Sequence, residues 1–188
     1  MTRRLILKGL ADRVVPTVND MDVSSTDYRA TISRFLTGVT LVTTRYEGIA
    51  QGITASAVAS VTLDPPTVLV CLNRQSGACH ATSASGRFCV HVLADDQLEL
   101  ARHFASREQD KFAVLAELGL VPARDSTLGN PRLDGALAYL ECQVATQTDV
   151  GTHRIFFGKV VAVEAREGSP LAYFRGQFTN LASGKSIP

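Results

Sequence analysis

The chain has 188 residues, of which 45% are hydrophobic and 20% charged, and its formal net charge is +1. This length suits one domain with a sizeable core and is short for two. A charge so close to zero argues against electrostatic binding of nucleic acid, which needs a concentrated basic face. The apolar runs are too short for a membrane span or for the core of a signal peptide. We therefore expect a cytoplasmic protein.

The N-terminal residues 1–25 mix charged, polar and apolar residues without a clear period, and we expect them to form a flexible arm. The folded domain is then expected over residues 26–188. It would begin with a helix capped within Ser24, Ser25 and Thr26 and ended by Gly38. The apolar residues that predict this helix by their spacing are Tyr28, Ile32, Phe35 and Leu36.

Most of the following chain has the pattern of strands joined by tight turns. The predicted strands cover residues 39–46, 52–63, 67–72, 87–93, 136–146, 153–166 and 171–178. The predicted helices cover residues 76–84, 98–104 after a cap at Asp95 and Asp96, and 109–118. Seven strands with only a few short helices indicate a β-barrel rather than a doubly wound sheet. Since neither GxGxxG nor GxxxxGK[ST] occurs, a nucleotide cofactor would need another binding device.

The four cysteines, Cys71, Cys79, Cys89 and Cys142, show neither a CxxC spacing nor a metal-ligand pattern. Cys79 and His80 are adjacent, but neighbouring side chains on a helix point about 100° apart. No acidic residue lies near in sequence to orient the histidine. We expect reduced structural thiols and no metal site.

The predicted strand over residues 52–63 is unusually rich in small side chains, where β-branched and aromatic residues normally cover a sheet. The small residues are Gly52, Ala55, Ser56, Ala57, Ala59 and Ser60. One interpretation is a large flat ligand lying against the backbone, with amide N–H groups and hydroxyls left to bind it. The other is a strand that crosses close under another element, which also needs small residues.

Several segments together, in their order and spacing, carry a family resemblance. They are residues 35–44, 52–57, 60–66, 68–72, 88–93, 104–105, 111–112, 140–142, 151–160 and 170–174. In these segments the chain resembles the short-chain flavin reductases, the reductase components of two-component flavin-dependent monooxygenases. The resemblance covers about residues 26–182.

This resemblance implies a mainly β split-barrel fold with a few short helices, which binds FMN or FAD and usually forms a homodimer. It implies an NAD(P)H:flavin oxidoreductase, with NADH or NADPH as electron donor. Reduced flavin would pass to a partner monooxygenase encoded elsewhere. The sequence does not distinguish FMN from FAD, or NADH from NADPH.

The resemblance also implies the site residues, carried over by position. The isoalloxazine ring would lie along Thr54, Ala55, Ser56, Ala57 and Val58, with Ser60 and Val61 close by. The ribityl chain and phosphate would be held by Asn73, Gln75, Ser76 and Gly77, where the N-terminus of a helix favours an anion. Phe104 and Lys111 would border the same cofactor. Structural alternatives stay open: Ser76 as a helix cap, Asn73 as a turn residue, Phe104 as a core residue and Lys111 as a solvated charge.

His153 matches the family's histidine associated with nicotinamide binding and is the candidate catalytic residue. Thr152 stands where the family commonly has Asp, so the imidazole loses a possible orienting partner and an influence that favours its protonated form. This departure favours the alternative of a flavin-binding electron carrier that does not oxidise nicotinamide itself. A barrel interaction module without a cofactor is a third hypothesis.

Overall fold

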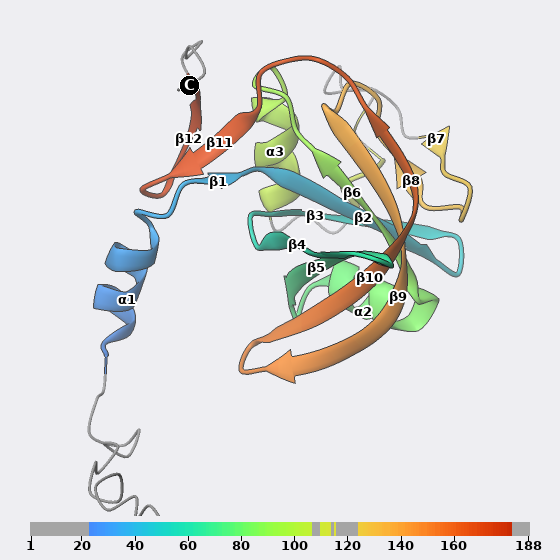
Figure 1. The fold of residues 1–188 in the computed structure, drawn as a ribbon, viewed down its shortest axis with the longest axis horizontal. Coiled ribbons are helices and arrows are strands. Elements are labelled where there is room, and N and C mark those ends of the chain that lie inside the picture. Colours follow the sequence, from blue (N-terminus) through green and yellow to red (C-terminus); the bar gives the residue numbers. More distant parts are fainter. Residues whose placement is uncertain (1–22, 107–109, 114, 116–123, 182–188) are drawn as a thin grey trace, which may run out of the picture.

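The computed structural model describes residues 23–106, 110–113, 115 and 124–181 (Figure 1). The arm predicted over residues 1–25 therefore lies almost entirely outside the described residues. No helix in the described part of the chain is both long and apolar enough to cross a membrane.

Seven strands form one antiparallel sheet with the spatial order β3-β2-β6-β9-β10-β5-β4 (Figure 1). Their bounds are β2 Thr40–Tyr46, β3 Ile49–Ala55, β4 Val58–Leu63, β5 Pro66–Asn73, β6 Arg87–Val92, β9 Ala138–Val150 and β10 His153–Ala165. The two edge strands, β3 and β4, are consecutive in sequence, with only Ser56 and Ala57 between them. The sheet must curl to bring these edges together, which is the expected split barrel.

The prediction of one strand over residues 52–63 is therefore wrong. The chain leaves β3 at Ala55 and begins β4 at Val58, on the opposite edge of the sheet. Small side chains favour this sharp change of direction, because they put little bulk where the two edges approach each other. The predicted end of the strand before Pro65 is confirmed, since β4 stops at Leu63.

Two smaller sheets complete the described strands. One has the order β1-β11-β12, with β1 Thr37–Gly38, β11 Leu171–Phe174 and β12 Gln177–Asn180; the other pairs β7 Arg124–Asp125 with β8 Pro131–Arg132. The single strand predicted over 171–178 is thus a hairpin. Its turn is made by Arg175 and Gly176, whose φ values are 52° and 80°, in the left-handed region that closes two-residue hairpins.

The first helix, α1, spans Ser25–Ile32 and is shorter than predicted. Of the three expected caps, Ser24 is the N-cap, because its Oγ accepts a hydrogen bond from the Asp27 N–H at 3.0 Å. Gly38 does not end the helix but belongs to β1. No residue of α1 is buried, and the helix stands apart from the main sheet (Figure 1).

The other two helices flank the sheet. Helix α2 spans Gly77–Ser85, with Ser76 as its N-cap and Gly86, at φ 69°, as its C-cap. Helix α3 spans Leu98–Ala105. Asp95 and Asp96 do not cap α3; instead the Gln97 side chain accepts the Ala94 N–H at 3.0 Å. Of the helix predicted over 109–118, residues 110–113 and 115 are described and form no helix, and the rest lies outside the described residues.

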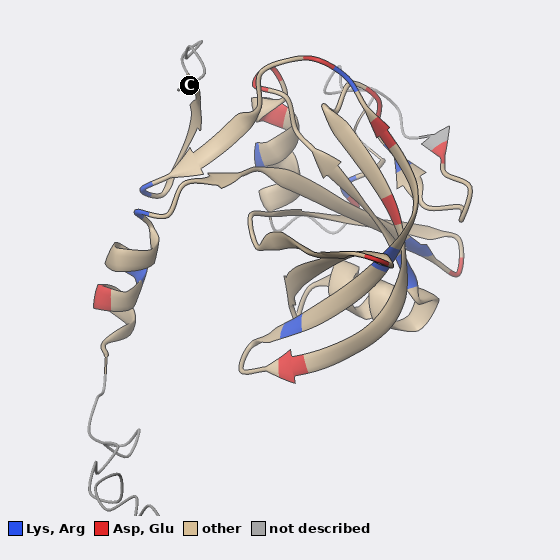
Figure 2. Ribbon diagram, in the orientation of Figure 1, with Lys and Arg blue, Asp and Glu red and all other residues tan. Residues whose placement is uncertain are grey.

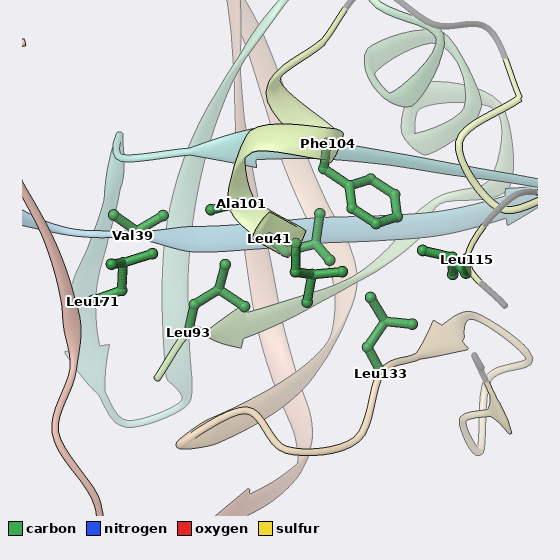
Figure 3. Close-up of a cluster of buried hydrophobic side chains, with 9 residues drawn as sticks. Val39, Leu41, Leu93, Ala101, Phe104, Leu115, Leu133 and Leu171 are labelled. Atoms are coloured by element: carbon green, nitrogen blue, oxygen red, sulfur yellow. The ribbon is translucent and has the colours of Figure 1, made fainter. Parts of the chain in front are cut away.

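Two apolar clusters lie on opposite faces of the sheet, because Leu41 and Val42 alternate along β2. Figure 3 shows the first cluster, in which α3 packs on the sheet through Ala101 and Phe104. The second cluster includes Cys79 of α2. The two helices are thereby fixed on the sheet at positions that leave the N-terminal end of α2 close to β3.

Candidate functional site

A cavity of about 880 Å³ lies between β3 and the N-terminal end of α2. Its lining comes from three parts of the chain that are distant in sequence. The residues are Ala50, Gln51, Gly52 and Ile53 of β3, Asn73, Gln75, Ser76, Gly77, Ala78 and His80 around the start of α2, and Ser106, Lys111 and Phe112 after α3. Five residues expected to bind a cofactor, Asn73, Gln75, Ser76, Gly77 and Lys111, therefore meet at one cavity.

Gly52 forms part of the cavity wall because two aromatic rings pack against it from behind. A Cβ at this position would lie 2.5 Å from Cε1 of Phe104 and 3.3 Å from Cε2 of Phe112. The close crossing of another element therefore explains this glycine. It does not explain Ser56, Ala57 and Ser60, which are exposed. The close-crossing interpretation therefore holds at Gly52, and the flat-ligand interpretation stays a prediction for the exposed residues.

The end of the cavity at α2 is organised by hydrogen bonds within the chain. The Ser76 Oγ accepts the Cys79 N–H at 3.1 Å and donates to the Asn73 carbonyl oxygen at 2.8 Å. Asn73 accepts the Gln75 N–H through Oδ1 at 2.9 Å. Ser76 is thus a helix cap and Asn73 a turn residue, as the structural alternatives had it. The Ser76 hydroxyl proton is already used within the chain and is not aimed at the cavity.

The backbone, rather than the Ser76 hydroxyl, supplies hydrogen-bond donors at this end. The first N–H groups of a helix have no partner within the helix. Among the described residues, the N–H groups of Gly77 and Ala78 have no acceptor. A Cβ on Gly77 would overlap the side-chain oxygen of Gln51, so only glycine leaves this corner of the cavity open. These features suit an anionic group.

Lys111, which lines the cavity, is linked to Phe104. The Lys111 Nζ donates to the Phe104 carbonyl oxygen at 2.7 Å, and the His103 Nε2 lies 2.7 Å from the Lys111 carbonyl oxygen. The Phe104 ring is fully buried in the first apolar cluster and does not line the cavity. Phe104 is therefore a core residue that supports Gly52, and Phe112 is the aromatic residue that borders the cavity.

The segment from Thr54 to Val61 comprises the end of β3, the connection Ser56–Ala57 and the start of β4, and it follows Ile53 of the cavity wall. The Thr54 hydroxyl donates to the Ala101 carbonyl oxygen at 2.7 Å, so it holds α3 against β3. Thr40 donates to the Ala55 carbonyl oxygen at 2.6 Å, and the Cys71 N–H donates to that of Ala57 at 3.0 Å. The backbone is thus fixed, while the small side chains at the connection are exposed.

The other residues of this segment that were expected near the isoalloxazine ring are Ala55, Val58, Ser60 and Val61. Val58 is half-buried against the second apolar cluster, whereas Ser60 and Val61 are exposed on the edge strand β4. None of the residues from Thr54 to Val61 lines the cavity itself.

His153 begins β10 and pairs with Asn73 of β5 in the sheet register. It therefore lies one strand away from the cavity wall. Its Nδ1 is 2.9 Å from the Thr152 hydroxyl oxygen. The carboxylate that the family commonly has is absent here, and the threonine hydroxyl provides an orienting contact in its place.

Cys79 is not placed to act as a nucleophile with His80. Its side chain is buried in the second apolar cluster, and burial raises the pKa of the thiol. The reactive form of cysteine is the thiolate, which burial disfavours. The described cysteines are all unpaired thiols.

Sequence reasoning missed Gln51, Ile53, His80 and Phe112 as parts of the cavity wall. None of them carries a signal of its own, because their roles depend on how α2 and the segment after α3 approach β3. Gly52 did carry one, since a glycine inside a strand often marks a close approach.

The profile of the family described as flavin reductase like domain matches residues 32–182. The chain belongs to this family. The relatives below are each similar to it over most of their length.

One relative is the reductase component of 4-nitrophenol 4-monooxygenase/4-nitrocatechol 2-monooxygenase from Rhodococcus opacus, 43% identical over 81% of this chain and 78% of its own. Another is the FMN reductase (NADH) RutF from Stutzerimonas stutzeri, 38% identical over 84% of this chain and 88% of its own. The crystal structure of nitrilotriacetate monooxygenase component B from Mycobacterium thermoresistibile superposes with a TM-score of 0.79 at 38% identity, covering 87% of this chain and 89% of that one. The flavin reductase fold predicted from the sequence is thus confirmed.

Proposed function

We propose that this protein is an NAD(P)H:flavin oxidoreductase that supplies reduced FMN or FAD to a flavin-dependent monooxygenase. One observation carries the proposal: the cavity that ends at the two unpartnered N–H groups of α2 lies beside an exposed connection of small residues. The free N–H groups suit a phosphate, and the small residues let a flat ring approach the backbone. Membership of the flavin reductase family, and relatives named as a monooxygenase reductase component and an FMN reductase (NADH), support it.

The residues present fit a flavin mononucleotide. The Gly77 and Ala78 N–H groups would bind the phosphate, with Lys111 at the same cavity contributing positive charge. Asn73 and Gln75 would face the ribityl chain. The ring would lie against the backbone of Thr54 to Val58, with Ser60 and Val61 at its border, because the exposed side chains of Ser56 and Ala57 are too small to hold it away.

The protein residues in this proposal bind, orient and exclude water; none needs to act as a strong acid or nucleophile. A bound flavin supplies the hydride-accepting chemistry itself. The chain's task is to hold the nicotinamide ring against the flavin ring at contact distance, which is catalysis by positioning. We assign the nicotinamide contact to His153, oriented by the Thr152 hydroxyl at 2.9 Å.

Phe104 acts in this scheme through another residue. Its ring packs against Gly52, and its carbonyl oxygen accepts a hydrogen bond from the Lys111 ammonium group. It is therefore a positioning residue for the cavity rather than a direct cofactor contact.

We further propose that the working unit is a homodimer and that it acts in the cytoplasm, where nicotinamide cofactors are available. Apolar side chains exposed on the edge strand β4 and on β10, among them Leu63 and Val163, support a second copy as the partner. The partner monooxygenase would receive the reduced flavin by transfer or by diffusion.

The test is an anaerobic reaction of the purified protein with FMN or FAD and either NADH or NADPH. We expect the oxidised flavin band to bleach with a rate proportional to protein concentration. The absence of bleaching with both nicotinamides would contradict the proposal. Bleaching that needs an added electron-transfer protein would instead support the electron-carrier alternative. That alternative was favoured by the absence of an orienting carboxylate beside His153, and the Thr152 hydroxyl contact weakens this argument.

A further inference from the structure

A second cavity, of about 620 Å³, lies on the other side of the turn that precedes α2. It is bounded by the start of α2 and by the tip of the β9–β10 hairpin, and its wall includes Arg74, Arg154 and Thr152. Asn73, Gln75 and His80 line both this cavity and the proposed flavin cavity. The two spaces are therefore neighbours that share a wall, and one extended ligand can reach both.

Arg154 forms the fixed side of this second cavity. Its guanidinium binds the Asp149 carboxylate through two hydrogen bonds, Nε to Oδ1 at 2.5 Å and Nη2 to Oδ2 at 2.9 Å. Its third nitrogen donates to the Ser83 hydroxyl at 2.8 Å. In Figure 2 the acidic end of β9 and the basic start of β10 face each other at the tip of this hairpin. A bidentate pair of this kind has a fixed geometry.

Arg74 is held much less firmly. Its Nε lies 3.4 Å from the Asp149 Oδ2, and its Nη1 lies 3.4 Å from the Gly151 carbonyl oxygen. Half of its side chain is exposed, whereas its backbone N–H is fixed to the Thr152 carbonyl oxygen at 3.0 Å. The Arg74 backbone is thus fixed. Its guanidinium is available for a better hydrogen-bond acceptor, because surface contacts of 3.4 Å contribute little binding free energy.

The charges of this cavity do not balance. In the described part of the chain Asp149 is the one carboxylate that contacts either arginine, and its two oxygens already bind Arg154. One positive charge is left in excess beside the exposed His80 ring. The cavity is also too large for a lone phosphate ion, and it opens beside the place proposed for the flavin phosphate.

We propose that Arg74 and Arg154 form a subsite for the phosphate of an adenosine nucleotide, with the adenosine filling the rest of the second cavity. This inference rests on the proposed function, since the nucleotide is the adenosine half of a dinucleotide cofactor. Two sources share this chemistry: the AMP half of FAD, and the adenosine phosphate of the nicotinamide donor. The shared wall of Asn73, Gln75 and His80 is where such a cofactor would pass between the cavities.

The first experiment measures binding without any reaction. Adenosine 5′-diphosphate is titrated into the flavin-free protein by calorimetry, with inorganic pyrophosphate as the comparison. We expect saturable binding of the adenosine diphosphate and weaker binding of pyrophosphate. Arg74→Ala should weaken the former roughly ten- to a hundredfold, the range expected for a hydrogen bond to a charged group. Arg102→Ala is the matched control, because Arg102 is a half-exposed arginine that pairs with Glu99 on α3.

The second experiment identifies the source. Dissociation constants of FMN, FAD, NADH and NADPH are measured for wild type, Arg74→Ala and Arg102→Ala by fluorescence titration. A loss confined to FAD assigns the subsite to the flavin, and a loss confined to NADH and NADPH assigns it to the donor. The FMN affinity should stay within twofold in either case.

Three outcomes would overturn the inference. They are a failure of wild type to bind adenosine 5′-diphosphate, equal affinity for pyrophosphate, and an Arg74→Ala protein that is less stable but binds every nucleotide as wild type does. The last would mean that the arginines only attach the hairpin to α2. A protein that binds adenosine 5′-diphosphate through Arg74 but does not reduce flavin would contradict the proposed function and leave the subsite standing.

Discussion

His91 is fully buried on β6, and both of its ring nitrogens are engaged. The Leu133 N–H donates to Nε2 at 3.2 Å, so Nε2 carries no proton, and Nδ1 donates to the Leu41 carbonyl oxygen at 3.2 Å. A second proton on Nε2 would face the Leu133 N–H without an acceptor. Burial accordingly lowers the pKa of His91 from 6.5 to about 4.

This histidine predicts a loss of stability in weak acid. Between pH 6.5 and about 4 the unfolded chain binds a proton at His91 that the folded chain does not. The free energy of unfolding should therefore fall as the pH drops through this window, by roughly 3 kcal/mol from this one group. Urea denaturation at pH 7, 5.5 and 4.5 measures it. Because carboxylates also titrate in this range, the control is His91→Gln. The free energy of unfolding of this variant should change less steeply with pH than that of wild type. Equal slopes in the two proteins would contradict the assignment to His91.

Thr152 predicts an effect on the nicotinamide substrate. Thr152→Val keeps the shape of the side chain and removes the hydroxyl 2.9 Å from the His153 ring. A neutral hydrogen bond contributes about 0.5–1.5 kcal/mol, so we expect KM for NADH to rise about two- to tenfold while the dissociation constant of FMN is unchanged. Thr148→Val, an exposed threonine on the same hairpin, should change neither value. An unchanged KM in Thr152→Val would mean that the ring is oriented by something else.

At the level of elements, α2 is bracketed by two glycines that are needed for different reasons. Gly77 begins the helix in a corner where a Cβ would overlap the Gln51 side chain, whereas Gly86 ends it at φ 69° with nothing within 4 Å of a Cβ. The first glycine leaves space for a ligand. The second provides a backbone conformation that other residues adopt at a cost.

The two alanine substitutions should therefore separate binding from stability. Gly77→Ala should lower the affinity for FMN several-fold and keep the thermal midpoint, because the displaced Gln51 side chain is flexible and moves into the cavity. Gly86→Ala should lower the free energy of unfolding by about 1 kcal/mol and leave FMN affinity within twofold. Flavin fluorescence titration and urea denaturation measure the two quantities. A Gly77→Ala protein with wild-type affinity would place the phosphate elsewhere.

The sequence predicted best those elements whose residues carry local signals. Ser24 and Ser76 have the short hydroxyl side chains that cap helices, and both do so. The turn between β2 and β3 has the same kind of local signal, since Gly48 readily adopts the positive φ of 80° that is found there. In each case a few neighbouring residues determine the conformation.

The errors occurred where the tertiary structure decides. The break at Ser56 and Ala57 has no Gly or Pro, and it exists because the curled sheet needs its next strand on the opposite edge. Only part of the cavity wall could be predicted. The family resemblance predicted the residues around Ser76. His80 and Phe112 line the cavity because α2 and the segment after α3 approach β3 there. Contacts between distant segments leave no local pattern in a single sequence.

At the scale of the whole molecule, apolar side chains are exposed in an arrangement that a single chain does not explain. The edge strand β4 is exposed over five of its six residues, Leu63 is 87% exposed and Val163 on β10 is 70% exposed. Helix α1 has the apolar spacing of a packed helix, yet none of its residues is buried. Exposed apolar residues that stand singly are normal, whereas extended patches mark interaction sites.

The proposed homodimer predicts that a charge on this surface separates the subunits. We expect wild type to have twice the mass of the chain by light scattering at micromolar concentration, and Val163→Glu to shift it to one chain, because a carboxylate is costly to bury without a partner. Val163→Thr, of similar shape and without charge, should remain dimeric.

Dissociation should also weaken flavin binding, since a ring lying against Thr54 to Val58, where Ser56 and Ala57 are exposed, needs a second surface to shield it from water. Val163 does not line the flavin cavity, so a lower FMN affinity in Val163→Glu together with a wild-type thermal midpoint would report the missing subunit rather than a damaged site. A wild-type protein that is monomeric at these concentrations and still binds FMN tightly would show that one chain completes the site alone.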